Sequence, residues 1–152
     1  DTALKFWDVG QSDALLQYVL CRLEFMQQRR GDDRQQESTQ LTCLTTWAVQ
    51  MYLDKLNRVQ EDETVSHVAK SNKLREVYKK FEAFLRDHKD FLDKSTTHSL
   101  IAGHGQVAEE QFFCELTDDW ERVITFHITQ TQDCAAAVDV LTRRCTEAKH
   151  EP

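Results

Sequence analysis

The segment Leu41–Val59, LTCLTTWAVQMYLDKLNRV, decides the fold class of this chain. Its apolar residues recur every three or four positions, the spacing that places side chains on one face of an α-helix. The recurring residues are Leu41, Leu44, Ala48, Met51, Tyr52, Leu56 and Val59. The segment therefore predicts a long amphipathic helix that stops at the acidic run Glu61-Asp-Glu63.

The same period extends over most of the 152 residues. One stripe runs from Leu15 to Met26, with Ser12 as its expected N-cap, and another runs from Leu74 to Leu92. An amphipathic helix cannot bury its apolar face alone, and such units stabilise one another by stacking in series. We predict an all-α fold, an α-solenoid of stacked antiparallel helical hairpins over residues 1–152. Longer helices are expected over about 12–92 and short hairpins over about 95–146.

The stretch Thr117–Ile128, TDDWERVITFHI, places two acids before an apolar run. Asp118 and Glu121 are spaced as a capping pair, and both carboxylates favour the positive end of a helix. The positions that then share one helix face are Trp120, Val123, Ile124, His127 and Ile128. The β-branched residues would also suit a strand. We predict a helix here, with Trp120 filling the core of a hairpin.

The last segment has a stripe of its own. Cys134, Val138, Leu141 and Cys145 recur at helical spacing, and the run Ala135-Ala-Ala137 would let a neighbouring helix approach closely. An aspartate, Asp133, precedes this segment as Asp118 precedes the one before it. The two segments are therefore expected to be similar short helices.

Composition narrows the possible function classes. The chain has 26 acidic and 19 basic residues, a net charge of -7, which is opposite to what binding to a phosphate backbone requires. No apolar run approaches the roughly 20 residues that span a bilayer. We therefore expect a soluble chain with no nucleic acid partner and no direct membrane insertion. Because it begins at Asp1 and ends at Pro152, we expect a fragment of a longer protein.

Metal and thiol chemistry are not expected. The five cysteines, an odd number, are widely spaced and form no C-x-x-C pair, which favours free thiols in a reducing compartment. His98 and His104 lie six positions apart with no cysteine pair near them. We assign no catalytic, metal-binding or cofactor-binding residue and no cofactor, and we expect no enzymatic activity.

One short motif resembles a nucleotide-binding fingerprint. Gly103-His104-Gly105-Gln-Val-Ala108 fits G-x-G-x-x-G/A, with 124–129 available as a second strand and Asp133 as its terminal acid. A dinucleotide site needs these glycines to follow a strand and to open a helix. The flanking helical periodicity leaves no material for such a sheet. A dinucleotide-binding enzyme using the Gly103–Gly105 turn is a remote alternative to a glycine turn between two helices.

Several aromatic side chains lie at helical spacing. Core packing is the favoured interpretation for each of them, and a role as partner anchor is the alternative. They are Trp47, Phe81, Phe84, Phe112, Phe113 and Trp120.

Two stretches resemble a known family. The helix Thr42–Leu56, with Trp47 in its middle and Tyr-Leu-x-x-Leu at its end, resembles the central segment of the Deep orange family of class C vacuolar protein sorting subunits. A later stretch is similar to the clathrin-heavy-chain-type helical repeat of that family: His104-Gly105, Phe112-Phe-Cys-Glu-Leu116, Asp119-Trp-Glu-Arg-Val123, His127 and Ala136-Val-Asp-Val-Leu141. The resemblance covers about Gln40 to Leu141.

This resemblance implies a cytoplasmic scaffold subunit shared by the HOPS and CORVET tethering complexes, peripheral on the membrane of late endosomes and of lysosomes or the vacuole. Its partners would be other class C tethering-complex subunits. The β-propeller and RING zinc module of family members have no counterpart in this sequence, so their properties do not carry over. No known partner-binding residue of the family matches a position here. The alternative is an α-solenoid segment of another vesicle-coat or nuclear-pore scaffold.

Overall fold

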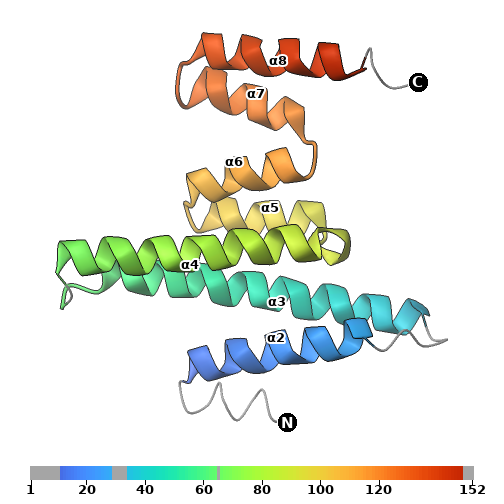
Figure 1. Ribbon diagram of the computed structural model, residues 1–152, viewed down its shortest axis with the longest axis vertical. Helices are drawn as coiled ribbons and strands as arrows, with labels where there is room; N and C mark the ends of the chain where they lie inside the picture. Colours follow the sequence, from blue (N-terminus) through green and yellow to red (C-terminus); the bar gives the residue numbers. More distant parts are fainter. Residues whose placement is uncertain (1–10, 29–33, 65, 149–152) are drawn as a thin grey trace. The chain divides into compact units, whose positions relative to one another are not determined.

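The computed structural model describes residues 11–28, 34–64 and 66–148. Within these ranges every regular element is a helix and there is no strand, so the all-α prediction is confirmed (Figure 1). The α-helices are α2 Ser12–Gln28, α3 Arg34–Glu61, α4 His67–His88, α5 Lys94–Gly103, α6 Val107–Leu116, α7 Trp120–Thr129 and α8 Cys134–Ala148; the 3-10 helix η1 is Lys89–Phe91. None of the described helices is long and apolar enough to cross a membrane.

The chain divides into two compact units. Unit 1 is Asp1–Gly105 and holds α2 to α5, and unit 2 is Gln106–Pro152 and holds α6 to α8.

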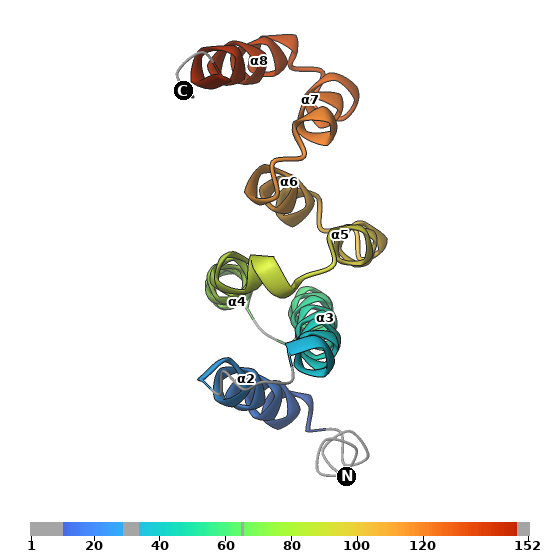
Figure 2. The ribbon, with the colours of Figure 1, turned by 90° about the vertical axis from the view of Figure 1, so that its right-hand side faces the viewer.

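Helix α3 is the centre of unit 1. It contacts α2, α4, α5 and η1, and Figure 2 shows these helices placed around it. Val49 and Met51 are both buried, although side chains two positions apart lie on nearly opposite sides of an α-helix. Because α3 buries more than one face, its sequence is apolar over a wider arc than a surface helix needs.

The packing of unit 1 follows the stripes seen in the sequence. Helix α2 buries Leu15, Leu16, Val19 and Leu23, and α4 buries Val77, Phe81, Phe84 and Leu85. Tyr52 of α3 stacks on Phe81, with ring centroids 5.4 Å apart. At the surface, Lys55 Nζ donates to Asp13 Oδ1 over 2.9 Å and ties α3 to α2. This hydrogen bond is the main reason that the pKa of Asp13 lies below its usual range.

Two helix boundaries differ from the sequence-based expectation. Helix α2 begins at Ser12 itself, whose hydroxyl accepts a hydrogen bond from the Arg58 guanidinium of α3. The stripe predicted to run on to Leu92 leaves α-helical geometry at His88, and η1 covers the next three residues. Leu92 is nevertheless buried, as its place on the predicted stripe requires.

Unit 2 has a small core of its own. Cys114 of α6, Val123 of α7 and Val140 of α8 are buried together, and Trp120 and Ile124 pack against them while partly exposed. Helix α7 contacts both α6 and α8. Val123, with no exposed surface, is the residue of α7 that fills this core, a role that the sequence analysis gave to Trp120. The indole N–H of Trp120 donates to Asp118 Oδ1 over 3.2 Å.

The cap of α7 is Asp119, one residue after the predicted Asp118. Asp119 accepts from the backbone N–H of Arg122, and Arg122 also pairs with its carboxylate at 2.9 Å. Asp118 has φ 58°, a left-handed conformation that aspartate tolerates better than most residues, and it turns the chain between α6 and α7. The sequence has two adjacent acids, and capping geometry selects the second. At α8 the aspartate before the helix is a cap, because Asp133 Oδ1 accepts from Ala136 N over 2.9 Å.

The predicted stripe of α8 faces outward. Val138 is 59% exposed and Leu141 is 47% exposed, whereas Ala137 and Val140 are buried. Cys134 is also exposed, and the side chain of Cys145 lies outside the described part of the structure. The helix has two adjacent apolar stripes, and the one that includes the small Ala137 packs inward. Of the alanine run, Ala137 is the residue that is buried.

Candidate interaction site

The glycine motif forms a turn between helices. Gly103 is the last residue of α5, His104 is its C-cap, and Gly105 has φ 69°, a conformation that glycine adopts without strain. A dinucleotide fingerprint requires a strand before the first glycine, and here a helix precedes it. The residues expected as a second strand, 124–129, belong to α7. The structure therefore gives the dinucleotide alternative no support.

His104 lies in a polar cluster on α3. Its Nδ1 is 2.9 Å from Asn57 Nδ2, its Nε2 is 3.0 Å from Gln50 Nε2, and Asp54 Oδ1 is 3.9 Å from Nε2. The Gln50 amide also donates to Asp54 Oδ1 over 3.0 Å. Both ring nitrogens of His104 are therefore within hydrogen-bond distance of a side-chain amide of α3. The cluster ties the end of α5 to α3.

The cluster around His104 is not predicted by the sequence pattern. Gln50, Asp54 and Asn57 recur four and three positions apart, so they form one polar stripe on α3. A polar stripe on an amphipathic helix is ordinarily in contact with solvent. Nothing in the local sequence shows that a histidine from another helix will contact this stripe. Their common spacing was the only available signal.

The described residues contain no cluster of three or more His, Cys, Asp or Glu side chains placed to hold a metal ion. Cys21, Cys43 and Cys134 are exposed free thiols, and Cys114 is buried. His127, predicted as a core member, is half-buried, and its buried Nδ1 has no hydrogen-bond partner among the described residues.

Cys114 should be the least reactive of the described thiols. Burial, and then the carboxylates of Asp119 and Glu110, raise its pKa from 9.0 to about 11. Since the thiolate is the nucleophile, we expect iodoacetamide at pH 8 to alkylate exposed Cys43 at least about a hundred times faster than Cys114. Peptide mass mapping over time measures both rates. Comparable rates in the folded chain would contradict the burial of Cys114.

The aromatic side chains divide into two groups. Phe81, Phe84 and Phe113 are buried, as the core interpretation predicts. Trp47, Phe112 and Trp120 are only partly buried. Among these, Trp47 lines a pocket.

This pocket is an open groove between α3 and α5, called the α3–α5 groove below. Helix α3 contributes Thr42, Cys43, Thr46, Trp47 and Gln50, and the other side is formed by Asp93, Thr96 and Leu100. Its lining is mostly apolar, from the indole, the leucine and the threonine methyl groups. Asp93 is the N-cap of α5 and accepts from Thr96 N over 2.8 Å. The groove therefore lies between two helices that are joined by His104, which contacts Gln50 and Asn57 of α3.

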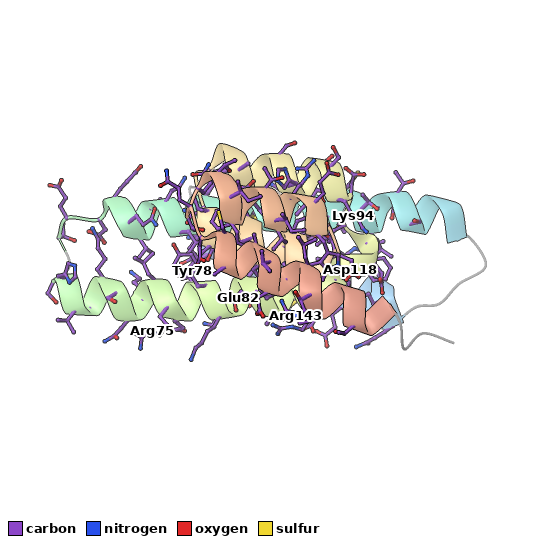
Figure 3. The ribbon with its side chains drawn as sticks, turned by 90° about the horizontal axis from the view of Figure 1, so that it is seen from above. Arg75, Tyr78, Glu82, Lys94, Asp118 and Arg143 are labelled. Atoms are coloured by element: carbon purple, nitrogen blue, oxygen red, sulfur yellow. The ribbon has the colours of Figure 1, made fainter. Side chains whose placement is uncertain are left out.

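The outer face of α4 is a second exposed surface. Arg75 and Lys79 are exposed, and neither has an ion pair in the part of the chain that the structure describes. Figure 3 shows Arg75 directed away from α3, while Tyr78 lies on the side that faces α3 and accepts a hydrogen bond from Gln60. This face is therefore an exposed surface with basic side chains.

Comparison with known proteins identifies the family of this helical chain. Residues 1–119 match the family model described as "VPS18, alpha-solenoid domain, first half". This chain belongs to the VPS18 family. The α-solenoid prediction is thereby confirmed, and the resemblance to vacuolar protein sorting subunits is confirmed at the level of the VPS18 family.

Curated VPS18 relatives match nearly the whole chain. "Vacuolar protein sorting-associated protein 18 homolog" of Danio rerio is 33% identical over 151 residues, 97% of this chain. "Vacuolar sorting protein 18" of Arabidopsis thaliana is 30% identical over 141 residues, 93% of this chain. The chain spans 14% of the length of each relative. No solved structure matches it.

Proposed function

We propose that this chain is a non-catalytic scaffold and protein-interaction segment of a VPS18-type subunit of the HOPS and CORVET tethering complexes. It would act in vesicle tethering and fusion, peripheral on the membrane of late endosomes and of lysosomes or the vacuole. The observation that carries this proposal is the match of residues 1–119 to a VPS18 solenoid, in a chain whose described elements are all helical. The Deep orange assignment, the clathrin-type repeat and a single solenoid over residues 1–152 stay predictions.

The proposed mechanism is mechanical. Each described helix buries one or more apolar faces on its neighbours, so the positions of exposed side chains within a unit are fixed by the core. Such a scaffold holds other modules at set positions and presents side surfaces to partner subunits. Partners of this kind would bring the chain to a membrane through the complex, and no cofactor is needed for this role.

Affinity purification tests the proposal. We expect the tagged chain, expressed in cells, to recover other class C tethering-complex subunits, identified individually by mass spectrometry. Recovery of vesicle-coat or nuclear-pore scaffold subunits in their place would assign the chain to the alternative class. Lys79→Glu reverses one exposed charge on the outer face of α4, and it shows whether recovery depends on the basic charge of that face.

A further inference from the structure

The α3–α5 groove is open to solvent and mostly apolar, as is a site that binds an apolar side chain. Trp47 and Leu100 belong to different helices and both line it, and Trp47 is only partly buried by the chain itself. Aromatic side chains in partly open pockets are frequent anchor points of protein interfaces. Both helices belong to unit 1, and Figure 2 shows them beside each other.

The register of the two helices gives the groove its length. Thr45 Oγ1 lies 3.3 Å from the carbonyl oxygen of Phe91, just before α5, and His104 at the other end meets Gln50 and Asn57. The two helices therefore run in the same direction along this contact. From Cys43 to Asp54 is about 16 Å along the axis of α3, which is about three helical turns.

The one charged residue that lines the groove is acidic, and a second carboxylate lies beyond the lining on α3. Asp93 is part of the lining, and Asp54 lies on the same stripe of α3, one turn beyond Gln50, with a side chain 39% exposed. No Lys or Arg is among the residues that line the groove. Hydrogen bonds from the hydroxyl of Thr96, and then from its backbone N–H, hold the pKa of Asp93 below its usual range. Asp93 is therefore a fixed negative charge at neutral pH.

We propose that the α3–α5 groove docks an amphipathic helix of a partner subunit that places an apolar side chain between Trp47 and Leu100 and basic side chains near Asp93 and Asp54. A helix of about three turns matches the length between the two carboxylates. An apolar centre with basic ends complements the apolar lining and the acidic ends. This inference rests on the proposed function, because it names the chemistry of a partner that the scaffold would hold.

A peptide titration tests the inference directly. The probe is an alanine-based helix of about 16 residues, with two leucines one turn apart and a lysine near each end. The protein carries Trp7→Phe and Trp120→Phe, so that Trp47 is the only tryptophan. We expect a saturable shift of Trp47 emission, and slowing of Cys43 alkylation by about tenfold or more at saturating peptide, because Cys43 is an exposed thiol of the same groove.

Variants separate the apolar and the charged contributions. Cys43→Arg should abolish the Trp47 shift, whereas Cys21→Arg, the same change at an exposed cysteine of α2, should leave it unchanged. Asp93→Asn removes the negative charge but keeps a residue type that caps helices well. It should therefore weaken peptide binding about two- to fivefold at low salt. That difference should vanish in about 0.5 M salt, where exposed charges are screened.

Three results would overturn the inference. Equal binding of a peptide with glutamate in place of lysine would remove the charge argument. Absence of any Trp47 shift and of Cys43 protection would remove the groove. Protection of Cys43 that rises with protein concentration and without peptide would make a second copy the occupant.

The tethering assignment can fail separately. If the protein with intact Cys43 and its Cys43→Arg variant recover the same class C subunits and no peptide binds, the proposed function stands and the groove proposal fails. If the peptide binds as expected but no class C subunit is recovered, the groove remains a binding site and the tethering assignment fails.

Discussion

Replacing Phe81 by alanine is expected to lower the free energy of unfolding of unit 1 by about 3–5 kcal/mol. Phe81 is fully buried between α3 and α4, and its ring stacks on Tyr52 with 29° between the ring planes. Truncation removes the transfer free energy of the ring and leaves a cavity that Tyr52 and Phe84 can close only in part. A loss of this size is a large part of the stability of an ordinary domain.

Denaturation in urea measures this loss, with Trp47 as the only tryptophan so that the signal comes from unit 1. A chain with two units need not unfold in one step, and a local reporter avoids mixing their transitions. Phe25→Ala is the matched control, because Phe25 lies on α2 and is 46% exposed. It should cost less than about 1 kcal/mol. Equal losses from the two changes would mean that Phe81 is not the centre of this core.

The sequence predicts helices better than it predicts their inner faces. For α3, one broad apolar pattern indicated a long helix, and its end at Glu61 agrees with the acidic run. For α8, two apolar stripes lie next to each other, and periodicity gives no reason to prefer the one with Ala137 and Val140. The choice depends on how closely α7 approaches, which is a tertiary property. Adjacent acids before α7 pose the same problem for its cap.

The candidate site was less predictable than the fold. The turn at Gly103–Gly105 was expected, but the polar cluster around His104 and the α3–α5 groove require α5 to return beside α3 after α4 intervenes. Such a pairing between helices that are not consecutive leaves no periodic signal in the sequence. Trp47 was assigned to the core for the same reason, since its helical spacing is identical whether α5 covers its ring fully or in part.

Val123→Asp is expected to unfold unit 2. Val123 is fully buried with Cys114 and Val140, and the described core of this unit has no basic group to pair with a new carboxylate. Burial of an unpaired charge costs several kcal/mol, so the charged form is stable only if the helices separate. Hydrogen exchange followed by mass spectrometry should show loss of protection along α6, α7 and α8, whereas amides of α3 keep theirs.

The same substitution on the outer stripe of α8 is the control. Val138→Asp places the carboxylate at a position that is 59% exposed. The opening free energies that hydrogen exchange gives for α7 and α8 should therefore stay within about 1 kcal/mol of those of the unchanged protein. Valine and aspartate have similar helix propensities, so the difference between the two variants reports burial and charge. If Val138→Asp removed protection as fully as Val123→Asp, the stripe of Cys134, Val138 and Leu141 would be the buried face, and the packing of α8 described above would be wrong.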